Sequence, residues 1–225
     1  MYLVRPPYLI KKLFPAAVWR MDALQKKIYL TFDDGPIPVV TPWVLDLLKQ
    51  EEIKATFFCV GNNVENNPEI YKRILAEGHG VGNHTYNHLN GWNTDTAKYI
   101  ENVNTCARLV DSKLFRPPYG KLKKSQIKIL QSKVQSPKSK VSVLDTQYSI
   151  PNTEYSIIMW DVLSGDYDLK TGKRQCLTNT TSHVRNGSIV LFHDSNKARE
   201  KLEYALPRFI EFAKEEGYEF GVVGQ

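Results

Sequence analysis

The segment KIYLTFDDGP, residues 27–36, decides the fold class of this 225-residue chain. Its apolar part, 28–32, is rich in β-branched and aromatic residues, as expected of a strand buried on both faces of a parallel sheet. Two carboxylates and a Gly-Pro turn follow directly. Reactive side chains of parallel α/β proteins gather where strands end and loops begin. The segment therefore predicts a buried strand that delivers Asp33 and Asp34 to a functional edge of the sheet.

The alternation of strand-like and helix-like segments continues along the chain. The predicted strands lie near residues 28–32, 55–60, 79–83, 113–116, 155–161, 188–193 and 218–223. The predicted helices lie near residues 41–51, 68–77, 94–110, 124–132, 173–185 and 197–216. Repeated β-α units imply right-handed crossovers and a parallel sheet. The sequence therefore predicts an α/β fold, and about seven parallel strands suit either an open sheet or an incomplete barrel.

Several predicted helices carry end signals. The pairs Thr41-Pro42 and Asn67-Pro68 each place a capping side chain before a first-turn proline. Gly78 and Gly217 follow predicted helix ends, where a left-handed backbone conformation commonly terminates a helix.

The chain is predicted to form a single domain over residues 27–225, with residues 1–26 as an N-terminal extension packed on it. Residues near 132–153 break the alternation because they are rich in Ser, Lys, Gln and Pro around a short apolar piece, 141–144. We interpret this stretch as an insertion that contains a small hairpin.

The net charge of +6 is concentrated in one stretch. Seven lysines and no acidic residue lie between Lys121 and Lys140, so the rest of the chain is close to neutral. A basic field over the whole surface, as nucleic-acid binding requires, is therefore absent from the sequence. We interpret the lysine-rich stretch as a solvated lobe, with contact to an anionic polymer as the alternative.

Other features bear on the cellular compartment. The cysteines are widely spaced and odd in number, which favours inert thiols: Cys59, Cys106 and Cys176. No apolar run approaches the ~18 residues of a membrane span. Lys11, Lys12 and Pro15 interrupt the apolar residues near the N-terminus, so no signal-peptide pattern is seen. The default expectation is a cytoplasmic protein, a monomer or weak oligomer.

Unusual polar residues follow four of the predicted strands. They are DDGP at 33–36, HTYNH at 84–88, RPPYG at 116–120 and HD at 193–194. Each has a plainer interpretation: a capped turn, surface or core histidines, a rigid turn like the near-copy at 5–8, and a core histidine. Their joint occurrence at successive strand ends favours a single site.

These residue types suit one kind of chemistry. Two histidines four apart, with one carboxylate, supply three ligands to a divalent ion and leave a position for water. Zinc fits such a set best, with cobalt, nickel and iron as alternatives. A second carboxylate can take the proton of the water, an arginine can hold that base ionised, and a histidine can protonate the leaving group. The parts describe a metal-assisted acyl hydrolase.

Together these motifs resemble the polysaccharide deacetylase family, also called the NodB-homology or carbohydrate esterase family 4 domain, over residues 27–223. The resemblance implies a distorted, incomplete (β/α) barrel. It implies a metal held by Asp34, His84 and His88. It implies a catalytic set made of the base Asp33, its partner Arg116, the Tyr119 N–H for the oxyanion, the acid His193 and its partner Asp166. It implies a substrate pocket lined by Leu191, Tyr167, Pro117 and Trp160.

One motif departs from the family pattern. The family's Asp-x-x-Asp-Trp appears here as Leu163 to Tyr167, so Leu163 replaces the first aspartate and Tyr167 replaces the tryptophan. Tyr167 can still stack on a sugar face. Trp43 and Trp92 are further aromatic candidates for the groove, and for all three aromatic residues a place in the core is an equal alternative.

The expected function is the removal of acetyl groups from an N-acetylated amino-sugar polymer or oligomer, such as peptidoglycan or a chitin-like glycan. The alternatives are O-acetyl ester hydrolysis on xylan and deacetylation of a small intracellular N-acetyl sugar or amide. A non-catalytic glycan-binding protein is disfavoured because base, ligands, arginine and acid are all present. An interaction protein that uses the lysine-rich lobe is a further alternative.

Overall fold

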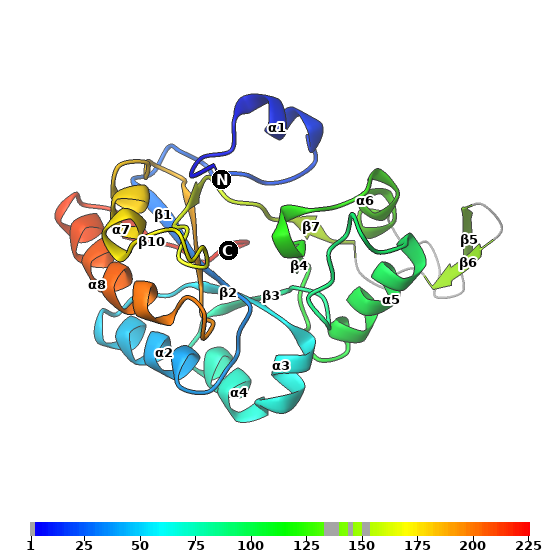
Figure 1. The fold of residues 1–225 in the computed structure, drawn as a ribbon, viewed down its shortest axis with the longest axis horizontal. Helices are drawn as coiled ribbons and strands as arrows, with labels where there is room; N and C mark the ends of the chain where they lie inside the picture. The colour runs from blue at the N-terminus through cyan, green and yellow to red at the C-terminus, as the bar shows by residue number, and fades with distance from the viewer. Residues whose placement is uncertain (1–2, 133–139, 144–145, 150–153) are drawn as a thin grey trace.

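The computed structural model describes residues 3–132, 140–143, 146–149 and 154–225. A curled sheet of parallel strands forms its centre, in the order β7-β4-β3-β2-β1-β9-β8, with β10 paired to β1 (Figure 1). The strands are β1 (Lys27–Asp33), β2 (Thr56–Cys59), β3 (Gly80–Asn83), β4 (Leu114–Phe115), β7 (Ser156–Ile157), β8 (Val162–Leu163), β9 (Ile189–His193) and β10 (Glu219–Phe220). The predicted distorted, incomplete (β/α) barrel is confirmed.

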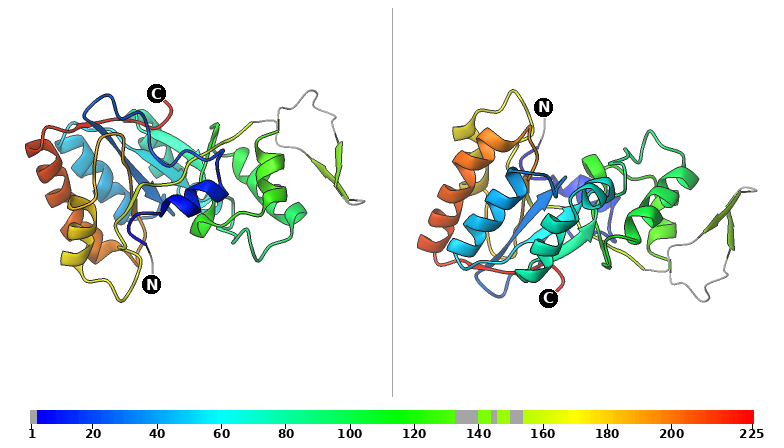
Figure 2. Two further views of the ribbon diagram at one scale, coloured as in Figure 1. Left: turned by 90° about the horizontal axis from the view of Figure 1, so that it is seen from above. Right: turned by 90° about the horizontal axis from the view of Figure 1, so that it is seen from below.

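The helices surround this sheet on its outer side (Figures 1 and 2). They are α1 (Tyr8–Leu13), α2 (Val40–Gln50), α3 (Gly61–Asn66), α4 (Pro68–Ala76), α5 (Thr96–Ala107), α6 (Lys124–Leu130), α7 (Lys173–Thr181) and α8 (Arg199–Glu215), with a short 3₁₀ helix η1 (Pro118–Gly120). Helices α2, α4, α5 and α8 turn an apolar stripe inward, as in α8, where Leu202, Leu206 and Phe209 are fully buried.

The core between β1, its neighbours and α8 is built on stacked aromatic rings. Phe32 of β1 lies 5.0 Å from Phe57 of β2 and 6.4 Å from Phe192 of β9, measured between ring centroids. All three side chains are buried, and each contributes roughly 1.5–3 kcal/mol relative to an exposed ring. This packing fixes the three central strands against each other.

Strand register brings the predicted functional residues to one edge. Asp33 is level with His193 across the β1–β9 pair, and Thr31 is level with Leu191. Asn83 of β3 pairs with Phe115 of β4, so His84 and Arg116 both follow directly at the same edge. The carboxyl ends of four strands therefore meet.

Some predicted elements differ from those observed. The predicted strand 155–161 contains only the short β7, which pairs with β4, because the chain then crosses to β8, which pairs with β9 at the other edge of the sheet. Helix α3 was not predicted, since its sequence GNNVEN lacks an apolar period. Helix α2 begins at Val40, so the prediction of Thr41 as its N-cap is wrong. Asn67 precedes α4 as predicted but makes no side-chain capping bond.

The N-terminal segment lies across both free edges of the sheet. Val18 pairs with Ile158, one residue beyond β7. At the other edge, the Leu163 N–H of β8 donates a 2.8 Å hydrogen bond to the Val4 carbonyl. These contacts support our proposal that residues 1–26 form an extension packed on a single domain of residues 27–225.

Asp161, just before β8, is the anchor of this extension. Its fully buried carboxylate accepts hydrogen bonds from Lys11 Nζ at 3.0 Å, Arg185 Nε at 3.1 Å, Ser188 Oγ at 3.0 Å and Arg5 Nη2 at 3.4 Å. Burial opposes the charged carboxylate, but the surrounding cations lower the pKa of Asp161 to about 2.

The predicted hairpin is confirmed in the backbone. β5 (Lys140–Val143) and β6 (Thr146–Ser149) pair antiparallel and lie at the periphery of the molecule in both Figure 1 and Figure 2. The remainder of the predicted insertion near 132–153 lies largely outside the described residues. The three cysteines are free and buried, as predicted.

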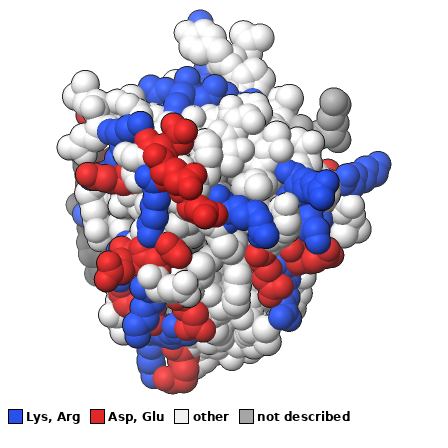
Figure 3. Space-filling view, turned by 90° about the vertical axis from the view of Figure 1, so that its left-hand side faces the viewer, with Lys and Arg blue, Asp and Glu red and all other residues white. Residues whose placement is uncertain are grey.

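Charges alternate in sign on the face that carries α7 and α8. Figure 3 shows acidic and basic side chains interleaved there. Arg199 pairs with Glu203 within α8, and Lys214 of α8 pairs with Glu51, both at 2.7 Å. Among the described residues, no helix has the length and apolar character needed to cross a membrane.

Candidate active site

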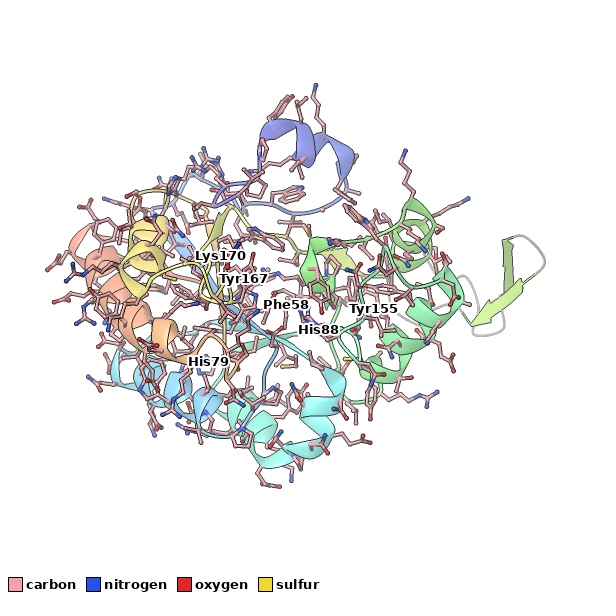
Figure 4. All side chains as sticks on the ribbon, viewed as in Figure 1. Phe58, His79, His88, Tyr155, Tyr167 and Lys170 are labelled. Atoms are coloured by element: carbon pink, nitrogen blue, oxygen red, sulfur yellow. The ribbon has the colours of Figure 1, made fainter. Side chains whose placement is uncertain are left out.

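A cavity of about 630 Å³ opens where the four strand ends meet. Nearly all the predicted site residues line it: Asp33, Asp34, His84, His88, Pro117, Tyr119, Trp160, Tyr167, Leu191 and His193. Leu163, Gly120, Lys121, Ser195 and Lys197 complete the lining. Figure 4 shows His88 and Tyr167 near the middle of the molecule, inside the ring of helices. Arg116 and Asp166 are fully buried behind this surface.

The predicted metal ligands come together without any rearrangement. Asp34 Oδ1 lies 3.2 Å from His88 Nε2 and 3.8 Å from His84 Nε2. One ligand atom from each of the three residues lies within 4.8 Å of the others. Two imidazoles and one carboxylate converging on one point have the composition and spacing of a three-ligand site for a divalent cation.

The orientation of His84 suits a metal ligand. Its Nδ1 lies 2.7 Å from the Arg116 carbonyl, and because a carbonyl only accepts, Nδ1–H is the donor. That fixes the tautomer and leaves the lone pair of Nε2 directed at the carboxylates. Burial lowers the pKa of His84 to about 4, which favours the neutral imidazole.

Arg116 holds Asp33 in place. Its Nη1 donates to Asp33 Oδ1 at 2.7 Å and to Thr31 Oγ1 at 2.8 Å. The other guanidinium donors reach the carbonyls of Ile158 at 3.2 Å and Met159 at 3.0 Å. The second carboxylate oxygen of Asp33 remains directed toward His84, 3.8 Å from its Nε2. One oxygen is thus anchored and the other faces the cavity.

His193 is fixed by a two-point contact with Asp166. Its Nδ1 lies 2.8 Å from Asp166 Oδ1, and its backbone N–H donates to Asp166 Oδ2 at 2.8 Å. Burial disfavours the charged ring, but the Asp166 carboxylate outweighs this and raises the pKa of His193 to about 9. Tyr167 packs edge-on against the ring, 5.0 Å between centroids. The Asp166 carboxylate therefore favours the protonated form of His193.

The backbone is strained around this cavity. Asp34, Thr85, His88 and Tyr119 all have positive φ, from 54° to 86°, a region that non-glycine residues seldom adopt. Such conformations persist only where surrounding contacts enforce them, and they cluster at functional sites. At Tyr119 this conformation presents the exposed ring beside His88, with 4.7 Å between centroids.

The two tryptophan candidates for the groove do not line the cavity. Trp43, a residue of α2, packs against the hydrophobic core. Trp92 is half-exposed, donates its indole N–H to the Leu122 carbonyl, and lies under Lys121 Nζ at 5.1 Å. Leu163 does line the cavity, where the family pattern would place a carboxylate, so that part of the wall is apolar here.

Sequence reasoning missed the residues that support the Asp34 turn. They are Thr41, Asn63, Asn67 and Asp194. The only sequence signal was the position of Asp194, directly after His193 at a strand end.

Comparison with known proteins places the chain in a family. The polysaccharide deacetylase family matches residues 20–133. A peptidoglycan-N-acetylglucosamine deacetylase of Bacillus cereus is 31% identical over 225 residues, which cover 96% of both chains. The crystal structure of the Bc1960 peptidoglycan N-acetylglucosamine deacetylase, bound to a hydroxamate-type benzamide, has a TM-score of 0.77 with 28% identity, covering 97% of this chain and 95% of that one.

A relative described as a pseudoenzyme is also similar. BA3943 of Bacillus anthracis, a carbohydrate esterase family 4 pseudoenzyme, has a TM-score of 0.72 with 25% identity, covering 93% of this chain and 68% of that one. The sequence identity and the fold that this chain shares with these relatives over nearly its whole length agree with the family match. The chain belongs to the polysaccharide deacetylase family.

Proposed function

We propose that this carbohydrate deacetylase is metal-dependent and acts on N-acetylated amino sugars of a peptidoglycan or chitin-like glycan. One observation carries the proposal: Asp34, His84 and His88 converge in a cavity that also holds Asp33 and His193, level with each other on β1 and β9. The peptidoglycan deacetylases among the relatives support the choice of substrate class.

The three converging side chains would hold the divalent ion. Their donor set and the fixed tautomer of His84 fit zinc, with cobalt, nickel and iron as alternatives. When bound, a zinc ion supplies Lewis acidity and lowers the pKa of a coordinated water to about 7.

The chain's own residues perform the proton transfers. Asp33, anchored by Arg116 through one oxygen, uses the other to accept the proton of the attacking water. The Tyr119 N–H donates to the oxyanion that develops on the acetyl carbonyl. His193 gives its proton to the departing nitrogen as the C–N bond breaks, which releases acetate and the free amine. Leu191 forms the wall against the acetyl methyl group.

The site favours an amide over an ester substrate. An amine leaves readily only if it is protonated as the bond breaks, whereas an alkoxide depends less on a strong general acid. The bidentate contact with Asp166 keeps a proton on His193 for that step.

Acetate release with added zinc or cobalt, and again with chelator, tests the proposal. The substrates are N-acetylglucosamine oligomers, peptidoglycan fragments, acetylated xylan and small N-acetyl sugars. We expect metal-dependent release from the amino-sugar glycans. Release from xylan alone, or release that chelator leaves unchanged, contradicts the proposal.

A further inference from the structure

We propose that Asp194 is a positioning residue, whose buried carboxylate holds the turn of residues 34–37 in the conformation that binds metal. The inference rests on the proposed function, because it concerns the same metal site. Asp194 follows the general acid on β9, whereas the turn follows β1. Its carboxylate would thus fix the geometry of the site from a position that touches neither substrate nor metal.

The carboxylate of Asp194 reaches the turn by two routes. Oδ1 accepts the Gly35 N–H at 3.1 Å, directly after the ligand Asp34. Oδ2 accepts the Thr41 hydroxyl at 2.6 Å, and Thr41 Oγ1 in turn accepts the Ile37 N–H at 2.8 Å. The amide donors of Gly35 and Ile37, on either side of Pro36, both depend on this pair, and Pro36 itself has none.

The turn's carbonyls are bonded from the other side. Asn63 Nδ2 donates to the Asp34 carbonyl at 2.7 Å, and the Val60 N–H donates to the Gly35 carbonyl at 3.0 Å. Asn67 Nδ2 donates to the Pro36 carbonyl at 3.2 Å. Hydrogen bonds therefore hold the turn from two sides. Donors from α3 and the residues that flank it bind its carbonyls, and the acceptors Asp194 and Thr41 bind its N–H groups.

Gly35 shows how closely Asp194 approaches. A Cβ at position 35 would lie 2.0 Å from Asp194 Oδ2 and 2.6 Å from its Cγ. The preceding Asp34 has a φ of 86°, which a non-glycine residue keeps only under constraint. The Asp194 N–H also donates to the Asp33 carbonyl at 3.1 Å, so it fixes the end of β1 as well.

Stability alone does not account for a carboxylate at this position. Asp194 is fully buried, and its partners among the described residues include no cation. A buried carboxyl group without a cation is unfavourable compared with an apolar residue of similar size. Burial and the charge of Asp34 raise the pKa of Asp194, whereas the hydrogen bonds from Thr41 and the Gly35 N–H oppose this rise by stabilising the carboxylate that accepts them. The contacts at the turn supply the reason for its presence.

Zinc affinity of the full chain, measured against a chromophoric competitor, tests this role. Asp194→Ala removes both acceptors, and we expect zinc affinity to fall about 10- to 100-fold, the range seen for residues that orient ligands. Asp194→Asn keeps an oxygen for the Gly35 N–H and is expected to restore most of the affinity. The visible spectrum of the cobalt-loaded protein should change in Asp194→Ala and resemble that of the wild type in Asp194→Asn.

A second pair of variants covers the case in which Asp194→Ala fails to fold. Thr41→Val has the same shape but loses both hydrogen bonds, whereas Thr41→Ser keeps them. Zinc affinity should be weaker in Thr41→Val than in Thr41→Ser. Equal affinity in the two variants overturns the proposal.

Asp161→Ala is the matched control, because it removes another fully buried carboxylate at the opposite end of β9. It should lower the melting temperature without changing zinc affinity. Circular dichroism first establishes that Asp194→Ala is folded. If the folded variant, like the control, has a lower melting temperature but unchanged zinc affinity, Asp194 is merely structural and the proposal fails. Zinc affinity in Asp194→Asn that is as low as in Asp194→Ala also contradicts the proposal. Silence of the wild type on every substrate, with zinc bound normally, refutes the proposed function alone.

Discussion

Arg116 is completely buried, yet its guanidinium makes contacts all around. It donates to Asp33, to Thr31 and to two backbone carbonyls, and it lies 4.0 Å from the centre of the Phe58 ring. A planar, permanently charged group with several fixed donors is suited to orient a carboxylate in an apolar environment. The proposed base, Asp33, is thus held at one oxygen while its other oxygen faces the cavity.

Substitutions at Asp33 and His84 should separate base from ligand. Asp33→Asn removes the proton acceptor but leaves the three ligands, so we expect acetate release to fall about 10²- to 10⁴-fold with zinc affinity retained. His84→Ala should lose zinc affinity and activity together. Zinc titration and acetate release on the same preparations check both. Full activity in either variant would contradict the assigned roles.

The pH profile should depend on Asp166. His193 acts as an acid only while protonated, and Asp166 raises its pKa to about 9, so wild-type activity should persist up to that pH. Asp166→Asn removes the largest of the contributions that oppose burial, which lowers the pKa of His193. The alkaline limb of kcat against pH should therefore move to lower pH. Asp168→Asn, on the same loop, is the control and should leave the limb unchanged. If the alkaline limb of Asp166→Asn lies at the same pH as that of the wild type, Asp166 does not raise the pKa of His193.

At the residue scale, the sequence predicted the functional side chains that lie at the ends of strands. Asp33, His84, Arg116 and His193 each follow a recognisable strand, so their convergence could be predicted from topology. Asp194 could not, because its role depends on a hydrogen bond to an amide 159 residues away. A backbone donor has no sequence signature.

Among the elements, β1 and β9 define the site. Their register sets Asp33 beside His193, and Phe32 and Phe192 pack behind them. Both strands are long and apolar, which is why they were predicted to within about one residue. Strands β7 and β8 have only two residues each, and α3 is polar, so no periodicity marked their limits.

The contact between the extension and the start of β8 should make stability depend on pH. The pKa of Asp161 is lowered when folded, so its contribution is present above the ordinary pKa of 3.8 and is lost as pH falls through about 2. Because its cationic partners are partly exposed, we expect Asp161→Asn to cost about 1–2 kcal/mol at pH 7. Urea unfolding of both proteins from pH 7 to pH 2 measures the difference. A difference that does not shrink toward pH 2 contradicts this origin.

For the whole molecule, the notable feature is a barrel whose two free edges are bridged by its own N-terminal segment. Val18 extends the β7 edge and Val4 bonds to the β8 edge. The alternation of strands and helices predicted a parallel α/β sheet and the family resemblance predicted the incomplete barrel, but neither predicted this bridging. Backbone pairing between residues so distant in sequence leaves no local pattern.

Deletion of residues 1–20 tests the importance of that segment. The deletion should lower the melting temperature by roughly 5–10 °C, because both edges and the buried Asp161 lose partners. Zinc affinity should change little, since the ligands belong to β1, β3 and their loops. Differential scanning calorimetry and zinc titration check this. An unchanged melting temperature would show that the extension is dispensable.

The anchoring of the extension by Asp161 also dictates an order of events during synthesis. Arg5 and Lys11 leave the ribosome long before their partner Asp161, which follows about 150 residues later, and Arg185 and Ser188 complete its surroundings later still. This N-terminal segment can therefore dock only after the sheet that it contacts has been synthesised. Until then both sheet edges stay open to other chains, so the nascent protein is most prone to aggregate just before the segment docks.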